Sequence, residues 1–294
     1  MFLDLNVPYP SHGGDLAELK KTVSLLRELG YQGVAYNYMA TGKEAANKTN
    51  PIKILNLSEL GGHGGVKNSA SDLPFVISAS RIAAKEFQQL SRLTVILEDI
   101  SANYQLTVNN PNVASYDLIA VQPTNEKLFL AACSSLEVDI ISLDMGSRLP
   151  FYIKQPIVNL ALQRGLFFEI SYGGAIRDAS ARRHLIRNAA SLIRATKGKN
   201  VVITSEAQKA LELRGPYDVI NLASIFSLNQ ALAKNSISAN CRAVLYRSAT
   251  RRQTNRGVLS VEPSANLAES DKWKEGMLED TDEGDEGDDA MDET

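Results

Sequence analysis

The chain has 294 residues, 44% of them apolar, so it is long enough to bury one large hydrophobic core or two modest ones. Its apolar runs stop short of the roughly 18–20 residues that cross a bilayer, and its first ten residues carry an acid and two prolines where a secretory signal carries cations. The two cysteines, Cys133 and Cys241, lack metal-ligand spacing, so a disulfide framework and a structural zinc site are disfavoured and a reducing compartment is expected.

Charge is divided unevenly along the chain. The formal net charge is −3, from 31 Lys and Arg against 34 Asp and Glu, but residues 268–294 hold 13 of the acids and only 2 of the lysines. The rest of the chain is therefore positive, at about +8, and a positive body with clustered arginines attracts a phosphate backbone. Because the acidic segment has almost no apolar residues, we expect a disordered acidic tail over residues 257–294.

The first forty residues predict a strand, a helix and a second strand. Residues 2–7, FLDLNV, predict a strand that prolines close, and residues 15–29 place apolar side chains at helical spacing before a terminating glycine. Residues 33–38 form the second strand. This order is the βαβ unit that builds a parallel sheet.

Residues 43–91 interrupt this regularity, and we interpret them as an irregular surface excursion, although residues 80–90 are compatible with a helix. The glycine run at residues 61–65 lacks the preceding strand and the Lys-Ser/Thr pair of a phosphate-binding loop, so a flexible loop is expected there.

Strands and helices alternate again from residue 93. We expect strands at residues 93–97, 116–121, 138–143, 166–170 and 201–204, and helices at residues 125–134, 150–164, 178–197, 216–228 and 238–252.

This alternation predicts a single TIM-barrel-like (β/α) domain over residues 1–256, with about seven parallel strands and a helical C-terminal end. A complete barrel of this type has eight strands, so either the barrel is incomplete or helix replaces its last strand. The alternative that the same alternation permits is an open doubly wound sheet.

In barrels, chemistry takes place where strands end. Metal-dependent barrel hydrolases often begin with His-x-His on the first strand, but Asp4 and Asn6 occupy that position, and none of the three histidines follows a strand. Carboxylates alone could still hold magnesium, so hydrolysis is disfavoured rather than excluded. For Asp144, Arg148 and Arg177, an ion-pair network at the rim and contact with a ligand are equally good interpretations. The candidates at the rim are Asp4, Asn6, Asp99, Gln122, Asp144, Arg148, Tyr172, Arg177 and Asp178.

Two helical segments concentrate arginines. Residues 176–199 hold seven Lys or Arg against one Asp, whereas a merely solvated helix face usually mixes both signs. The terminal helix contains no acid between Ser238 and Arg256, and we expect its arginines to face outward; its Tyr246 could stack on a base or simply pack. Guanidinium groups suit phosphate recognition. The RNA-binding candidates are Arg177, Arg182, Arg183, Arg187, Arg194, Arg242, Arg247, Arg251 and Arg252.

Four segments resemble one known family, the thirty-kilodalton protein subunit shared by nuclear ribonuclease P and ribonuclease MRP. The longest and most specific is FEISYGGAIRDASARRHLIRNAASLIRATKGKNVVITSEA at residues 168–207. The others are FLDLNVPYP at the N-terminus, SRLPFYIK at residues 147–154 and LRGPYDVINLASIFSL at residues 213–228. The resemblance runs from Met1 to about Arg252 and is weakest over residues 42–90.

This resemblance implies a TIM-barrel-like fold similar to that of the polymerase-and-histidinol-phosphatase metallohydrolases. It also implies a non-catalytic subunit that binds the ribonuclease P/MRP RNA, a small α/β protein subunit and other proteins of the complex, and that contacts precursor tRNA only indirectly. The complex would act in 5′ processing of precursor tRNA, and in rRNA processing as MRP, in the nucleus and nucleolus. Magnesium is expected on the RNA, with no cofactor on the protein and no membrane contact.

Two alternatives to the RNA-binding subunit remain open at this point. One is a metal-dependent phosphoesterase that uses carboxylates at the barrel mouth, and it rests on fold alone. The other is a protein-only adaptor whose arginines contact acidic partners.

Overall fold

The computed structural model describes residues 1–10, 16–56, 87–98 and 110–253. Contacts group Met1–Arg252 into one compact unit. The predicted acidic tail, the glycine run and the candidate Asp99 lie outside the described residues, as does most of the predicted excursion. Within the described part of the chain, no helix combines the length and apolarity that crossing a membrane requires.

The core of this unit is a sheet of seven parallel strands whose spatial order is the same as their order in the sequence. A doubly wound sheet reverses its strand order, so the sequential order selects the barrel and excludes the alternative. The strands are β1 (Leu3–Pro8), β2 (Gly33–Thr41), β3 (Gln88–Leu97), β4 (Leu118–Pro123), β5 (Ile140–Ser142), β6 (Phe167–Ser171) and β7 (Val201–Thr204).

The barrel is nearly closed between β7 and β1. The backbone N–H of Glu206, just after β7, donates to the Asn6 carbonyl of β1 at 2.9 Å, and the N–H of Leu3 donates to the Ile237 carbonyl at 3.1 Å. The described residues contain no eighth strand, so Ile237, at the end of a helix, supplies a hydrogen bond that a strand would otherwise make. The prediction of seven strands with a helical C-terminal end is confirmed.

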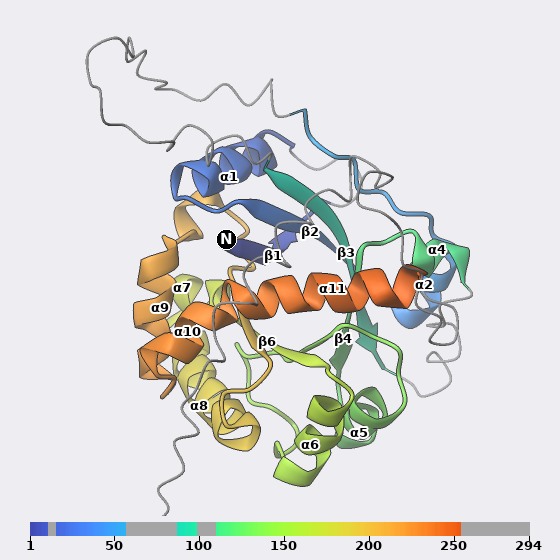
Figure 1. Cartoon of the computed structure of the whole chain (residues 1–294), viewed down its shortest axis with the longest axis vertical. Coiled ribbons are helices and arrows are strands. Elements are labelled where there is room, and N and C mark those ends of the chain that lie inside the picture. Colours follow the sequence, from blue (N-terminus) through green and yellow to red (C-terminus); the bar gives the residue numbers. More distant parts are fainter. Residues whose placement is uncertain (11–15, 57–86, 99–109, 254–294) are drawn as a thin grey trace, which may run out of the picture. The chain divides into compact units, whose positions relative to one another are not determined.

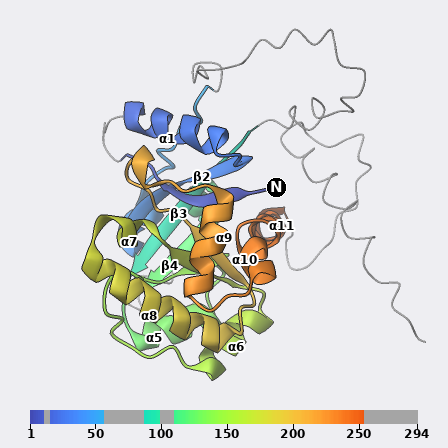
Figure 2. The ribbon, with the colours of Figure 1, turned by 90° about the vertical axis from the view of Figure 1, so that its left-hand side faces the viewer.

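Helices surround the strands and bury their apolar faces against the outer side of the sheet (Figures 1 and 2). The longer helices are α1 (Leu16–Glu28), α5 (Glu126–Ser134), α6 (Gln155–Gln163), α8 (Ala179–Thr196), α9 (Pro216–Ile225) and α11 (Ala239–Gln253). The shorter ones are α2 (Gly42–Asn47), α4 (Pro111–Ala114), α7 (Gly173–Arg177), the 3₁₀ turn η2 (Ala210–Glu212) and α10 (Gln230–Ser236).

α11 does not lie beside the other helices but crosses the end of the barrel at which the strands begin (Figure 1). Its Asn240 donates to the carbonyl of Val201, the first residue of β7, at 2.7 Å. Its Arg247 donates to the carbonyls of Val138, just before β5, and of Arg164, which precedes β6. α11 therefore covers the opening of the barrel opposite the rim where strands end.

Several boundaries differ from those predicted from the sequence. β3 begins at Gln88, so the helix suggested for residues 80–90 is wrong over residues 88–90, while its earlier part is not described. The helix expected from residue 150 begins at Gln155, because residues 150–154 form a connection that ends where Pro156 occupies the first helical turn. The separate helix α10 was not predicted.

Candidate nucleic-acid interface

The side chain of Asp178 caps the N-terminus of α8. The Asp178 carboxylate accepts the backbone N–H of Ala181 at 2.8 Å, which satisfies one of the free donors of the first helical turn. Hydrogen bonds from the amides of Ala181 and Ser180 hold the pKa of Asp178 below its usual value. The rim candidate Asp178 is thus exposed but serves to start the helix.

The preceding loop explains the Tyr-Gly-Gly sequence. A Cβ atom at Gly173 would lie 2.5 Å from the Ser205 carbonyl oxygen, so the residue after Tyr172 must be glycine for α7 to pack against the chain leaving β7. The Gly173 N–H donates to the same carbonyl at 2.8 Å. This contact fixes the path by which the chain enters α8.

The inner face of α8 anchors the helix to the barrel. Leu185, Ala189 and Leu192 are buried, in the three-and-four spacing that the sequence predicted. Asn188 is also buried, and its side-chain amide donates to the carbonyls of Met145 and Ser147 at 3.2 and 2.8 Å. The helix is therefore tied both to the sheet and to the loop after β5.

The outer face of α8 presents three arginines together. Arg183, Arg187 and Arg194 are exposed, and helical geometry places them within about 40° of one another over roughly 16 Å of helix length. Among the described residues, none of the three forms an ion pair. Figure 2 shows α8 running along the outside of the barrel on the side that faces the viewer. We call these three residues the α8 arginine face.

The other two arginine candidates of this unit are partly engaged. Arg177 forms an ion pair with Glu212 at 2.7 Å and donates to the Glu206 carbonyl at 3.2 Å. Arg182 donates through Nε to the Ala175 carbonyl at 2.9 Å. The charge of Arg177 is therefore balanced by Glu212 at the rim. The charge of Arg182, near the start of the α8 arginine face, is not balanced by an ion pair with a described residue.

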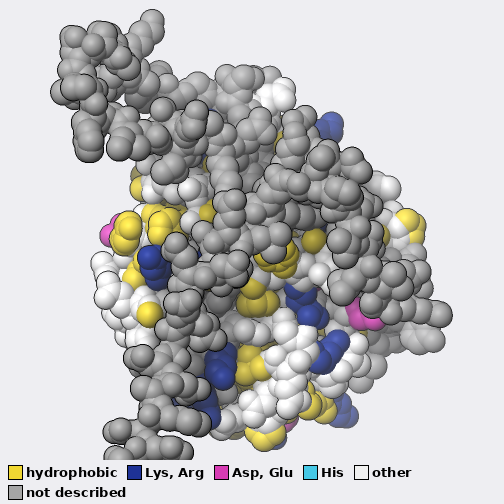
Figure 3. All heavy atoms as spheres, in the orientation of Figure 1, with side chains coloured by type: hydrophobic (Ala, Val, Ile, Leu, Met, Phe, Trp, Pro, Cys, Tyr) yellow, Lys and Arg dark blue, Asp and Glu magenta, His cyan; other side chains and the backbone are white. Residues whose placement is uncertain are grey.

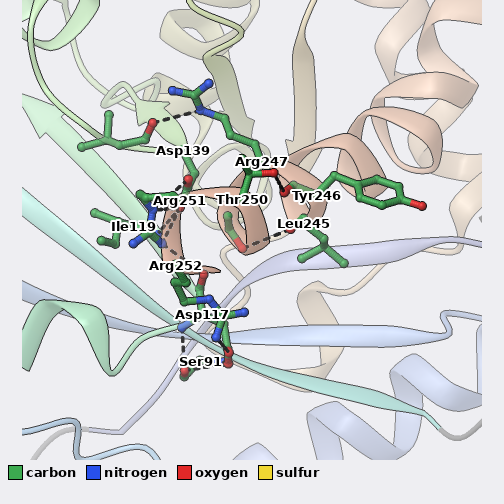
Figure 4. A network of polar contacts seen from close by, with 12 residues as sticks. Ser91, Asp117, Ile119, Asp139, Leu245, Tyr246, Arg247, Thr250, Arg251 and Arg252 are labelled. Atoms are coloured by element: carbon green, nitrogen blue, oxygen red, sulfur yellow. Dashed lines mark hydrogen bonds and ion pairs between the residues drawn. The ribbon is translucent and has the colours of Figure 1, made fainter. Parts of the chain in front are cut away.

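The arginines of α11 lie in a different environment (Figure 4). Arg251 contacts both oxygens of Asp139, with its closest contact to Oδ2 at 2.9 Å, and only 8% of the Arg251 side chain and none of Asp139 is exposed. Arg252 pairs with Asp117 at 2.8 Å. Asp117 also accepts two hydrogen bonds from Ser91, and Asp139 accepts one from the Ile119 N–H.

These contacts correct the predicted orientation of α11. Arg247 and Arg251 turn inward, toward backbone carbonyls and Asp139 at the starts of the strands, rather than outward to solvent. The sequence prediction failed because it considered only the absence of acids within the helix, while the acids that attract its arginines precede β4 and β5. Arg242 is half-exposed.

The remaining rim candidates do not assemble into one site. Asp144 is exposed and accepts hydrogen bonds from the N–H of Gly146 and the hydroxyl of Ser147. Arg148 is also exposed, and within the described residues it forms no ion pair with Asp144. Of the three residues expected in an ion-pair network or in contact with a ligand, Arg177 alone forms an ion pair among the described residues, and its partner is Glu212.

Asp4 and Asn6 occupy separate polar environments. Asp4 is 2% exposed and accepts from the Ser205 N–H at 3.2 Å, while its second oxygen has no hydrogen-bond partner among the described residues. Burial raises the pKa of Asp4 to about 6. A bulge between Asp4 and Val7 shifts the register of β1, and Asn6 instead binds Glu169 and Asn37 inside the barrel.

The barrel interior contains a buried ion pair that sequence reasoning missed. Arg92 of β3 is fully buried and binds both carboxylate oxygens of Glu169 of β6, at 2.6 and 2.5 Å. Burial opposes ionisation of Glu169, but Arg92 and hydrogen bonds from Thr204 and Ser142 outweigh it, so the pKa of Glu169 lies below its usual value. The signal was present in the sequence as single charged residues within the apolar runs LSRLTVI and FFEI.

This interior does not suit a catalytic metal. Both oxygens of Glu169 are already occupied by a guanidinium, whose positive charge would repel a cation at the same place. Among the described residues, no three His, Cys, Asp or Glu side chains converge as metal ligands. The fully buried Glu169 carboxylate therefore serves as the partner of Arg92, and the exposed cations of the α8 arginine face remain as the candidate binding surface.

Known proteins with similar sequences indicate one family for this chain. The family model described as RNase P subunit p30 matches residues 1–253. The chain is 40% identical over 259 residues to the ribonuclease P protein subunit p30 of Mus musculus, covering 88% of this chain and 91% of the relative. It is 31% identical to the ribonuclease P/MRP protein subunit RPP1 of Saccharomyces cerevisiae, covering 76% and 72% of the two chains.

Structural similarity supports the same fold. A chain in the cryo-EM structure of archaeal ribonuclease P with mature tRNA superimposes with a TM-score of 0.58, covering 89% of this chain and 98% of the archaeal one, at 14% identity. The family model spans the whole described barrel, and both relatives exceed 30% identity over most of their length. The chain therefore belongs to the RNase P subunit p30 family.

Proposed function

We propose that this chain is a protein subunit of a ribonuclease P/MRP ribonucleoprotein and that it binds the RNA of the complex through the α8 arginine face. Family membership over residues 1–253 supports the assembly. The observation that carries the RNA contact is the set of three exposed arginines aligned on one helix face, none of which forms an ion pair with a described residue.

In this role the chain contributes binding surfaces rather than catalytic groups. It contacts the RNA and other protein subunits, a small α/β subunit among them, and thereby supports 5′ maturation of precursor tRNA and, in the MRP form, rRNA processing. Any magnesium needed for cleavage sits on the RNA. The site of action is the nucleus, including the nucleolus.

The RNA contact is mainly electrostatic in this proposal. Arginine binds phosphate through a planar fork, and contacts to the phosphate backbone carry no sequence information. The chain therefore holds a shaped RNA in place, and its affinity should fall steeply with salt because bound counterions are released.

Purification of the native complex tests the assignment. The full chain, carrying an affinity tag, is expressed at its natural level, and the RNA that accompanies it is sequenced and assayed for cleavage of precursor tRNA. We expect one or two defined structured RNAs and precursor tRNA cleavage at the 5′ end. Recovery of the protein with other proteins but with no enriched RNA would instead support a protein-only adaptor.

The purified chain alone provides the second arm of this test. We expect it to be inert toward phosphate esters with magnesium or manganese. Hydrolysis that disappears on Asp4→Ala or Asp144→Ala would establish the phosphoesterase and overturn the non-catalytic role.

A further inference from the structure

A polar hollow lies between α6 and the turn that joins α8 to β7. Its volume is about 380 Å³, within the roughly 300–1,000 Å³ of small-molecule sites. One wall consists of a single face of α6, and the other is the end of α8 with the following turn. The residues that line the hollow are Gln155, Asn159, Leu162, Gln163, Thr196, Lys197, Lys199 and Asn200.

The turn that forms one wall is held in a fixed conformation. Lys197, Gly198 and Asn200 all have positive φ, at 55°, 75° and 50°, and among these Lys197 is the residue type that seldom adopts this left-handed conformation. A Cβ at Gly198 would lie 2.8 Å from a Leu232 side-chain atom, so this buried glycine seats the turn against α10. Asn200 donates to the Leu166 carbonyl at 3.2 Å. The turn therefore presents Lys197 and Lys199 from a rigid support on either side of Gly198.

The groups around the hollow are free to bind a ligand. Lys197 and Lys199 are exposed and form no ion pair with any described residue. The side-chain amides of Gln155, Asn159 and Gln163 make no hydrogen bond within the described part of the chain. No Asp or Glu lines the hollow, so nothing in its wall neutralises the two lysines.

The hollow continues the α8 arginine face. Arg194 precedes Lys197 by three residues, or about one helical turn, so cationic groups extend from Arg183 along the helix to the rim of the hollow. Figure 3 shows some Lys and Arg side chains at the lower left, in the area where the C-terminal part of α8 lies in Figure 1, and others at the lower right. An RNA backbone that follows the arginine face would therefore reach the hollow.

The chemistry of the lining selects the kind of ligand. The two lysines suit a phosphate, whereas each side-chain amide offers both a donor and an acceptor, as the edge of a nucleobase and a ribose 2′-hydroxyl require. Leu162 adds an apolar surface on which a base can pack. We propose that the hollow holds one unpaired nucleotide of the bound RNA, with its phosphate on Lys197 and Lys199 and its base and ribose against the amides of α6.

This inference rests on the proposed RNA-binding function but goes beyond it. The α8 arginine face alone would bind any phosphate backbone, paired or unpaired. The hollow adds a preference for RNA with a nucleotide extruded from its helix, since only an unstacked base can enter it. An acidic peptide could use the lysines and the amides too, so a competing peptide is one arm of the test.

Two RNA probes separate these possibilities. One is a perfect duplex longer than a helical turn, and the other is the same duplex with a single-nucleotide bulge, both labelled for fluorescence anisotropy with the full chain. Wild-type protein should prefer the bulged RNA by about threefold to tenfold, the equivalent of one or two net hydrogen bonds. The double variant Asn159→Ala with Gln163→Ala should lose this preference and keep its affinity for the perfect duplex.

The lysine variants supply the matched comparison. Lys197→Ala with Lys199→Ala should weaken binding of both probes, whereas Lys127→Ala with Lys209→Ala, which removes two exposed lysines elsewhere on the barrel, should weaken neither. Circular dichroism confirms folding of each variant.

The outcomes distinguish this inference from the function on which it rests. If wild-type protein binds both probes equally, or the amide variant keeps the preference, the nucleotide site is wrong while RNA binding stands. If a poly-glutamate peptide competes as well as the bulged RNA and the amides have no effect, the hollow is a peptide site. If wild-type protein binds neither RNA, and the α8 arginine face makes no difference, the proposed function fails as well.

Discussion

α8 and α11 are both rich in arginine, and their sequences alone suggested the same role. In α8 the arginines lie opposite a buried apolar face and form no ion pair with any described residue. In α11 two of them pair with Asp117 and Asp139, which stand just before β4 and β5. The difference shows that the density of arginine in a helix does not identify a binding surface. What decides whether the arginines of a helix can bind a ligand is whether acidic side chains of other elements pack against them.

Removing one arginine from each helix tests this difference between α8 and α11. Arg251→Ala leaves Asp139, which is fully buried, without its cation, and we expect the free energy of unfolding to fall by about 3–5 kcal/mol. Arg187→Ala removes an exposed charge and should change it by less than about 0.5 kcal/mol. Urea denaturation of the two full-length variants measures both values.

Equal losses for the two variants would contradict the structural role assigned to α11. A second variant, Asp139→Asn with Arg251→Gln, keeps both side chains neutral and should recover part of the stability that Arg251→Ala loses.

A second comparison concerns two buried acids, Asp139 with its arginine and Asp4 with an unpartnered oxygen. The pKa of Asp4 is raised from 3.8 to about 6, so between these values the folded chain keeps a proton that the unfolded chain releases. Stability contributed by this site therefore declines as pH rises from about 4 to about 6, and the decline is complete above that range. We expect Asp4→Asn to remove this decline. Between pH 4 and pH 7, its free energy of unfolding should therefore rise by up to about 3 kcal/mol relative to that of wild type.

Urea titrations of wild type and Asp4→Asn at several pH values provide this measurement. A constant difference between the two proteins across the range would show that the carboxyl group of Asp4 does not titrate in the way that its burial implies.

The smallest predicted effect concerns the start of α8. Asp178→Ala removes the side-chain cap and should lower the Tm by about 2–4 °C. Glu137→Ala removes an equally negative but exposed side chain with no described partner, and it should have almost no effect. If the two variants melt alike, the cap does not support the helix that displays the arginine face.

The sequence predicted the barrel well because its signals are local and repeated. All seven strands and the main helices lie near their predicted positions, since buried parallel strands are short apolar runs and the covering helices have one apolar face. The short helices α7 and α10 were missed because packing against neighbouring loops, as at Gly173, defines them rather than their own periodicity.

The candidate site was only partly predictable, for a different physical reason. The three residues of the α8 arginine face could be found because the helix that carries them specifies which side is buried. The inward turn of Arg251 and the pair of Arg92 with Glu169 depend on residues 112 and 77 positions away in the chain. No local pattern contains information about such partners.

The salt dependence of RNA binding tests the central claim most directly. The RNA retained by the native complex is titrated with full-length wild type, with Arg183→Ala/Arg187→Ala/Arg194→Ala, and with Arg27→Ala/Lys127→Ala/Lys209→Ala, which removes three exposed cations from other elements. The α8 variant should lose affinity at least about tenfold, and the slope of log affinity against log salt should fall by about 2–3, because each lost phosphate contact lowers it by roughly 0.7–0.9. The control variant should match wild type. Equal slopes for all three proteins would contradict the assignment of the α8 arginine face as the RNA-binding surface.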